Sequence, residues 1–414
     1  GGSNWTSYLS TASEISGVNF SLINKNIGSA GLVVMQVVNE KGAGLGFVKD
    51  FIAPSVISVT DNVSGTANTT TSNVAYTYTF SEPVFGLTGS DFQVTNGSVA
   101  SVTGSGSSWV VNVTPASGVA SGNITLALGA GAVTDTYNND SVAYSQSAQA
   151  IDTVVPVIAS IAISGATGAQ NSTLNAGDVV SVTVTTDGAV SVTGTPQLAL
   201  NMGGTTVQAN YTSTGSTSTA LKFNYTIQSN QNDTDGISLD ANALTLNGGS
   251  VTDAAGNALS LTSSIVADNA SYKVDNVAPA VVTVASSVSY GPASFVAETS
   301  QDGYSVILKA GEGLVVDPSA ANNFTLLVGG IELHPTGVSA SHPNWLQLNF
   351  ASPITRNDAL RLAYSGGITD LGGIALPAFD YSDVRNAVAY STTFSVKGLS
   401  FIQRDMAGGE NYIE

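Results

Sequence analysis

Residues 74–80, Val74-Ala75-Tyr76-Thr77-Tyr78-Thr79-Phe80, alternate between large apolar and small side chains. Successive side chains of an extended strand point to opposite faces, so a period of two predicts a strand with one buried face. The alternation recurs as far as Tyr364 and predicts antiparallel strands packed as sandwiches. Further examples are Trp109, Val111 and Val113; Ile124, Leu126 and Leu128; Val180, Val182 and Val184; Leu198, Leu200 and Met202; Leu221, Phe223, Tyr225 and Ile227; Phe324, Leu326 and Val328; Leu346, Leu348 and Phe350; and Leu360 and Leu362.

Two short sequence marks repeat along the chain. The pattern Asp-x-x-x-Pro begins at Asp50, Asp152 and Asp275, which lie 102 and 123 residues apart. The pattern Val/Ile-Thr-Asp ends at Asp135, Asp253 and Asp370, which lie 118 and 117 residues apart. Two independent marks with a period near that of one immunoglobulin-like sandwich predict tandem modules of this type.

The marks divide the chain into three complete modules and two flanking segments. We expect module 1 at 51–153, module 2 at 154–277 and module 3 at 278–390. Residues 1–50 are predicted to be part of a further module, either its C-terminal part or a sheet completed by another chain. Residues 391–414 are predicted to be a tail with one strand at 394–399. No amphipathic helix is predicted, and residues 319–322 are expected to form at most a single turn.

Composition narrows the classes of function. The 414 residues carry a net charge of −18, which argues against a nucleic-acid partner and against docking on an anionic membrane surface. No apolar run approaches the length of about 20 residues that a membrane helix needs. The chain has no cysteine, which excludes disulfides and thiolate-bound metals. Only 10% of residues are charged, and this composition favours a secreted β-protein on the bacterial surface.

One long segment contains acids without bases. No lysine or arginine occurs between Lys49 and Lys222, yet this segment carries nine carboxylates. These carboxylates either lie apart in water or are neutralised from outside. Calcium is the expected external cation, because it is hard and takes several oxygen ligands.

Particular motifs resemble known bacterial modules. The segments 80–84, 89–92 and 133–135 (Phe-Ser-Glu-Pro-Val, Gly-Ser-Asp-Phe and Val-Thr-Asp) look like the bacterial Ig-like repeats of large surface adhesins. Modules 2 and 3 resemble further varieties of such repeats, through motifs that include 253–257 and 356–358. The resemblance implies a cell-surface protein, commonly stiffened by calcium, of the adhesin, biofilm or S-layer type.

Two departures from these repeats bear on the metal. Asp187 stands where a Phe-Ser-Glu type motif is common, which puts its equivalence as a ligand in doubt. The turn at 368–373 lacks the Gly-Asn ending that module 2 has at Asn257.

The candidate calcium ligands are oxygen-bearing side chains at linkers, strand ends and turns. A competing interpretation is that aspartate is common in turns because its side chain accepts hydrogen bonds from nearby amides. The candidates are the linker acids Asp50, Asp152 and Asp275, the turn residues Asp135, Asp253, Asn257 and Asp370, and the strand-end acids Glu82 and Glu312.

Other motifs point less clearly to a site. Residues 233–236, Asp-Thr-Asp-Gly, have part of a calcium-loop spacing but lack the later glutamate, so a hairpin loop is the preferred interpretation. The only histidines, His334 and His342, both precede proline and are expected to be exposed loop residues. With this scarcity of general bases we expect no enzymatic activity.

Two functions fit these observations. The first is a calcium-stiffened adhesive or spacer segment of a bacterial surface protein, whose partners are neighbouring modules and whose host or surface ligands bind elsewhere. The second is a self-assembling S-layer or filament subunit, in which copies join head to tail, for example by strand donation between the chain ends.

Overall fold

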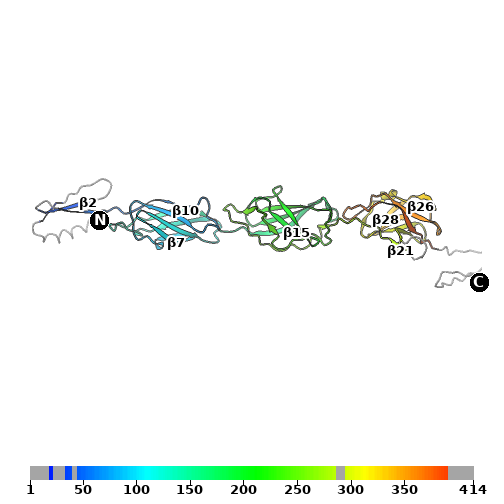
Figure 1. Cartoon of the computed structure of the whole chain (residues 1–414), viewed down its shortest axis with the longest axis horizontal. Coiled ribbons are helices and arrows are strands. Elements are labelled where there is room, and N and C mark those ends of the chain that lie inside the picture. Colours follow the sequence, from blue (N-terminus) through cyan, green and yellow to red (C-terminus); the bar gives the residue numbers. More distant parts are fainter. Residues whose placement is uncertain (1–17, 22–32, 40–43, 286–293, 390–414) are drawn as a thin grey trace, which may run out of the picture.

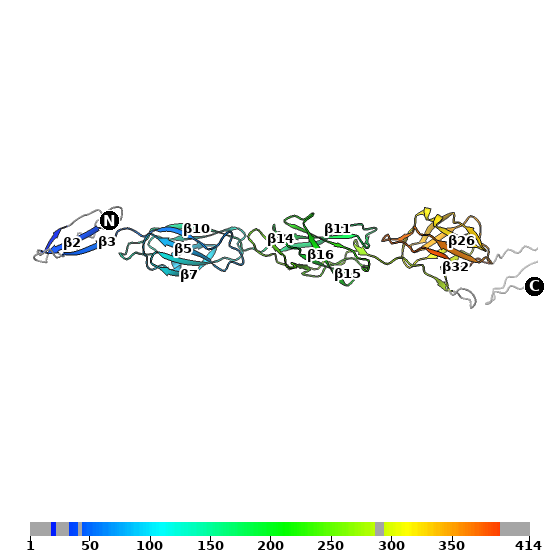
Figure 2. The same ribbon diagram turned by 45° about the horizontal axis from the view of Figure 1, so that its top comes forward.

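The computed structural model describes residues 18–21, 33–39, 44–285 and 294–389. Within these ranges β-strands dominate, and the helical elements are two short 3₁₀ turns, η2 (Gly89–Asp91) and η3 (Pro318–Asn323). The all-β prediction is confirmed, and η3 covers the predicted turn. The predicted strand at 394–399 lies outside the described residues. The modules follow one another along the long axis of the molecule, as Figure 1 and Figure 2 show.

Module 1 is a sandwich of a four-stranded sheet, ordered β4-β5-β8-β7, and a three-stranded sheet, ordered β10-β9-β6. The large apolar side chains of β5 are buried and the small side chains between them are partly exposed, as the period of two predicts. The strands are β4 (Val56–Thr60), β5 (Val74–Phe80), β6 (Phe92–Thr95), β7 (Gly97–Ser105), β8 (Ser108–Pro115), β9 (Gly122–Leu128) and β10 (Tyr144–Ile151).

The main sheet of module 2 has six strands, ordered β11-β13-β17-β16-β15-β18. The module also contains the two-stranded pairs β12-β20 and β14-β19. Its core cluster lies within 174–274 and is separate from the module 1 cluster within 67–151. The strands are β11 (Ile158–Thr167), β12 (Thr173–Leu174), β13 (Val179–Thr186), β14 (Ser191–Thr193), β15 (Gln197–Met202), β16 (Thr205–Thr212), β17 (Ala220–Thr226), β18 (Leu244–Thr245), β19 (Ser250–Thr252) and β20 (Lys273–Val274).

Module 3 has an eight-stranded sheet, ordered β27-β26-β30-β32-β23-β24-β29-β28, around a third core cluster within 297–384. The pairs β21-β22 and β25-β31 complete it. The strands are β21 (Val284–Ala285), β22 (Ser294–Phe295), β23 (Ala297–Thr299), β24 (Ser305–Lys309), β25 (Leu314–Val315), β26 (Phe324–Val328), β27 (Ile331–Leu333), β28 (Gly337–His342), β29 (Trp345–Asn349), β30 (Leu360–Tyr364), β31 (Thr369–Asp370) and β32 (Phe379–Arg385).

Each module closes with a parallel pairing between an early segment and its last strand. The pairs are Ala67 with Ile151, Thr173 with Lys273, and Ala297 with Val384. In the first two modules this pairing continues into the following linker, because the linker aspartate's backbone N–H donates to the early segment. Asp152 donates to the carbonyl oxygen of Ala67 and Asp275 to that of Leu174, both at 2.9 Å. The linker acids therefore leave their modules in the same way.

Ahead of module 1, the described residues form a three-stranded antiparallel sheet of β1 (Val18–Ser21), β2 (Val33–Asn39) and β3 (Gly44–Lys49). The strand β3 ends directly before Asp50, so this acid begins the linker into module 1. We call the linkers that begin at Asp50, Asp152 and Asp275 the first, second and third junctions.

Candidate functional site

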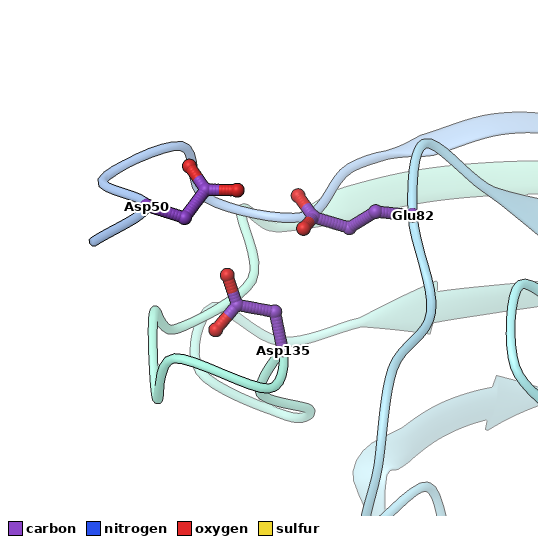
Figure 3. A group of neighbouring side chains, drawn as sticks. All are labelled: Asp50, Glu82 and Asp135. Carbon is purple, nitrogen blue, oxygen red and sulfur yellow. The ribbon is translucent and has the colours of Figure 1, made fainter. Parts of the chain in front are cut away.

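The first junction brings three acids from distant parts of the sequence together. Asp50 comes from the linker, Glu82 from the segment after β5 and Asp135 from the loop after β9. One carboxylate oxygen of each lies within 4.8 Å of the others, and Figure 3 shows the three side chains converging. Such a group offers oxygen ligands of the kind that a hard divalent cation prefers.

The turn at the end of module 1 sets the position of Asp135. Its Oδ1 accepts hydrogen bonds from the backbone N–H groups of Tyr137 at 2.7 Å and Asn139 at 2.8 Å. Its Oδ2 accepts one from the Asn139 side-chain amide at 2.7 Å. Burial alone would raise the pKa of Asp135, but the hydrogen bonds from Asn139 and Tyr137 bring that pKa below its ordinary value. The carboxylate is therefore held in its charged form.

Glu82 has fewer compensating contacts. Burial, followed by the negative charges of Asp50 and Asp135, raises its pKa. The glutamate is consequently destabilised as an anion unless a positive charge joins the group. The missing lysines and arginines of this part of the chain leave no cation from the module to do so.

The third junction repeats the arrangement with different surroundings. Asp275, Glu312 and Asp370 each place one carboxylate oxygen within 4.8 Å of the others. Asp370 is only 1% exposed. Its Oδ1 accepts the backbone N–H of Ile374 at 2.8 Å, whereas its Oδ2 is buried and has no hydrogen-bond partner among the residues that the structure describes.

The negative charges of the acidic group at the third junction are unfavourably placed. Burial raises the pKa of Asp370 despite the hydrogen bond from Ile374, and the charge of Asp275 raises it further. Burial, then the charges of Asp275 and Asp370, raise the pKa of Glu312. A buried, unpartnered carboxylate oxygen costs folding free energy unless a cation, a proton or water satisfies it.

At the second junction, hydrogen bonds link three of the predicted calcium ligands: Asp152, Asp253 and Asn257. The side-chain amide of Asn257 donates to the Asp152 carbonyl oxygen at 3.1 Å and to Asp253 Oδ2 at 2.9 Å. Asn257 is fully buried. Among the residues that the structure describes, no group of three acids forms at this junction. Asp152 and Asp253 therefore meet through an amide and without a third carboxylate.

The backbone register explains the missing acid. Residue 81 donates its N–H to the Ser55 carbonyl oxygen, and its side chain accepts from the Ser55 N–H. Asp187 makes the same two contacts with Val157. Asp187 thus occupies the place of Ser81 and not that of Glu82.

Gly188, one residue later, occupies the place of Glu82 and has no side chain to offer. Gly311 makes the matching contact in module 3, donating its N–H to the Ala280 carbonyl oxygen. Glu312 therefore corresponds to Glu82.

Amides of the preceding module also reach across two junctions. At the second, Asn68 Nδ2 donates to the Ala255 carbonyl oxygen at 2.7 Å, and the Thr69 N–H donates to Asn257 Oδ1 at 2.9 Å. At the third, Asn171 and Asn175 donate to the carbonyl oxygens of Leu371 and Gly372, both at 2.9 Å. At both junctions these bonds place the turn of one module beside a loop of the module before it.

Sequence reasoning named Asn257 but missed its counterparts. Asn139 stands four residues after its turn aspartate, as Asn257 does, and also donates to the linker carbonyl oxygen, that of Asp50, at 3.0 Å. Ile374 holds the same place in module 3. Comparing the residue four after each turn aspartate would have found all three.

The remaining candidates lie elsewhere. Asp233 is buried and accepts hydrogen bonds from Gly203 and Gly236, which supports a structural loop. His334 and His342 are both exposed and join no acidic group among the described residues. Within those residues, no helix is both long and apolar enough to cross a membrane.

Comparison with known families confirms the resemblance for module 1. Residues 50–151 match the model of the bacterial Ig-like domain. This match fits an extracellular, cell-surface protein. No curated protein matches the chain.

Several solved structures are similar to this chain at low identity and low TM-score. A Bacteroides ovatus mixed-linkage glucan utilization locus protein, SGBP-B, in complex with a mixed-linkage heptasaccharide, is 14% identical with a TM-score of 0.18, over 81% of this chain and 71% of that one. The surface layer protein SbsC, domains 1–6, is 12% identical with a TM-score of 0.17, over 81% and 54%. Three N-terminal domains of the bacteriophage RB49 outer capsid protein Hoc are 11% identical with a TM-score of 0.21, over 81% and 99%.

Proposed function

We propose that this chain is a rod-like structural segment of a bacterial cell-surface protein, of the adhesin or biofilm type, whose junctions are stiffened by calcium. Its modules hold other parts of the protein, or a neighbouring copy, at a distance from the cell. The ligand of such a protein binds outside these modules. The observation that carries the proposal is the convergence of linker, strand-end and turn acids at the first and third junctions.

The geometry supports a mechanical role because each group spans a junction. Asp50 and Asp275 belong to linkers, whereas the other acids of each group belong to the module that follows. A cation bound to both parts resists bending between them, and backbone carbonyl oxygens and water complete a shell of six to eight oxygens. The proline of each linker restricts the chain further by fixing φ.

The expected energy is moderate. Calcium modules outside the cell bind at about 10⁻⁴–10⁻³ M, and saturation at about 100 times the dissociation constant stabilises a site by about 2.7 kcal/mol. This is less than the usual stability of a domain, about 5–15 kcal/mol. Removing calcium should therefore loosen the junctions while the modules stay folded.

Small-angle X-ray scattering of the full chain, in calcium and after chelation, tests the proposal. We expect a rod in calcium and a broader range of shapes after chelation. The double variant Glu82→Gln/Glu312→Gln should lose this response. A matched control, Asp240→Asn/Asp380→Asn, removes the same charge from exposed acids of modules 2 and 3 and should keep it.

Identical scattering in calcium and chelator would contradict stiffening. Negative-stain electron microscopy of the same samples separates the two kinds of assembly. Separate rods support a spacer, whereas calcium-dependent sheets or filaments would favour the self-assembling alternative.

A further inference from the structure

The three junctions differ at two equivalent positions. The strand-end position holds Glu82 at the first, Gly188 at the second and Glu312 at the third. The position four residues after the turn aspartate holds Asn139, Asn257 and Ile374, in that order. The first junction therefore has an acid and an amide, the second an amide alone, and the third an acid alone.

At the third junction the carboxylate oxygen Oδ2 of Asp370 accepts no hydrogen bond from the described residues, and the amides of Asn171 and Asn175 reach only backbone carbonyl oxygens of the turn. Ile374 has no amide, so the Asp370 Oδ2 that corresponds to the amide-bonded oxygens of Asp135 and Asp253 is left buried without a partner. The carboxylates of Asp275 and Glu312 lie close to that of Asp370 and add like charge. An unpartnered oxygen within a three-carboxylate group specifies a cation more strongly than the acidic group alone.

At the second junction the amide already does what a cation would do. Asn257 bridges the Asp152 carbonyl oxygen and Asp253 Oδ2, and its own oxygen accepts the N–H of Thr69 from module 1. One buried side chain thus ties together the linker, the turn and the preceding module. With Gly188 in place of the glutamate, there is no third carboxylate to repel the other two.

We propose that these two positions decide which junction responds to calcium. The third junction depends on calcium for its order, whereas the second is held together without it. Modules 1 and 2 therefore move as one unit. This inference rests on the proposed function, since it specifies which junctions calcium controls. Asn257 acts as a built-in substitute for the cation, and Ile374 leaves the third junction open to one.

Distance measurements by pulsed electron paramagnetic resonance on the full chain test this directly. The chain has no cysteine, so spin labels attach only where cysteine is introduced. The pair Thr103→Cys and Gln208→Cys reports on the second junction, and the pair Gln208→Cys and Ser339→Cys on the third; all three positions are exposed. We expect chelation to broaden the distance distribution of the second pair of labels and leave the first pair unchanged.

Two substitutions test the two positions one at a time. Gly188→Glu supplies the missing acid; a Cβ at Gly188 meets no heavy atom within 4 Å, and its φ lies outside the left-handed region, so the site accepts a side chain. We expect the second junction to gain calcium binding, while Asn257 keeps it ordered after chelation. Ile374→Asn supplies the missing amide, and the third junction should stay ordered after chelation, whereas Ile374→Val, which cannot donate, should behave as the parent.

The outcomes separate this inference from the proposed function. If both junctions loosen on chelation, the inference is overturned and calcium stiffening stands. If neither loosens although calorimetry shows calcium binding, stiffening at these junctions fails as well. If Gly188→Glu leaves calcium binding unchanged and Ile374→Asn does not weaken it by about tenfold, the two positions do not control the cation.

Discussion

The second and third junctions place an aspartate in the same turn and satisfy its carboxylate in different ways. Asp253 and Asp370 both accept, on Oδ1, the N–H of the residue four positions later, at 2.9 and 2.8 Å. Asp253 Oδ2 then accepts a hydrogen bond from the amide of Asn257, whereas Asp370 Oδ2 accepts none from the described part of the chain. The turn has the same geometry in both modules, so the comparison teaches that one neighbouring side chain decides the outcome. It determines whether the aspartate is fully hydrogen-bonded within the protein or needs a ligand.

The largest effect is expected from neutralising Asp370. Asp370→Asn removes one charge of the three-carboxylate group and a ligand, so the calcium-induced stabilisation of module 3, about 2.7 kcal/mol near saturation, should disappear. Hydrogen exchange measured by mass spectrometry resolves this gain module by module. Asp380→Asn, at an exposed acid of the same module, should retain the gain; an equal loss in both variants would show that general charge is responsible.

Removing the bridging amides should affect the first and second junctions differently. Asn257→Ala breaks the bonds to Asp152, Asp253 and Thr69 and should destabilise the second junction by about 2 kcal/mol, with no rescue by calcium.

The matched variant Asn139→Ala frees Asp135 beside an intact acidic group, so calcium should restore part of the loss. Hydrogen exchange in calcium and in chelator compares the two variants. Calcium rescue of Asn257→Ala would contradict the distinction between these junctions.

Acid should stabilise the third junction of the calcium-free protein. The pKa values of Glu312 and Asp370 are raised in the folded state, mainly by burial, so the folded chain binds their protons more tightly than the unfolded chain. Their cost to stability is present above the folded pKa and disappears as the pH falls toward the ordinary carboxyl value of about 4.

Module 3 should therefore become more protected from exchange, after correction for intrinsic rates, as the pH of the chelated sample falls from neutrality. Asp135 behaves oppositely: its lowered pKa contributes stability that is lost only when the pH falls through that lower value. A loss of protection in module 3 over the mildly acidic range would show that the raised pKa values do not govern it.

The smallest effect is expected from removing a buried, unpartnered oxygen that carries no charge. The hydroxyl of Tyr78 in the module 1 core is also buried without a partner. Because it carries no charge, Tyr78→Phe should change the free energy of unfolding by at most about 1 kcal/mol, in the stabilising direction, and equally in calcium and chelator. Thermal unfolding in both conditions measures this; a calcium-dependent shift would show that an unpartnered oxygen couples to calcium without charge.

Much of the fold followed from local pattern. The alternation at residues 74–80 appears as β5, and that at residues 221–227 appears as β17, because a strand's two faces impose a period of two on the side chains that must be buried. The linker and turn marks likewise showed where Asp50, Asp135 and Asp370 stand relative to the modules. Local sequence was sufficient here because strands and turns are specified by neighbouring residues.

The grouping of the acids needed the tertiary structure. Glu82 and Asp135 are separated by strands of both sheets, and they meet only because those sheets pack against each other. The equivalence of Glu82 with Gly188, instead of Asp187, depends on backbone hydrogen bonds between each linker and a strand end about 30 residues away. A shift of one residue along that pairing has no signature in the local composition.

The sequence by itself determined the strands, the repeated modules, the surplus of carboxylates and the residue types available at each junction. Only the tertiary structure decided that Asp370 Oδ2 is buried without a partner and that Asn257 completes the second junction. The physical reason is that periodicity depends on which residues are adjacent in the chain. The satisfaction of a buried polar atom depends on which groups the packed modules bring within hydrogen-bonding distance.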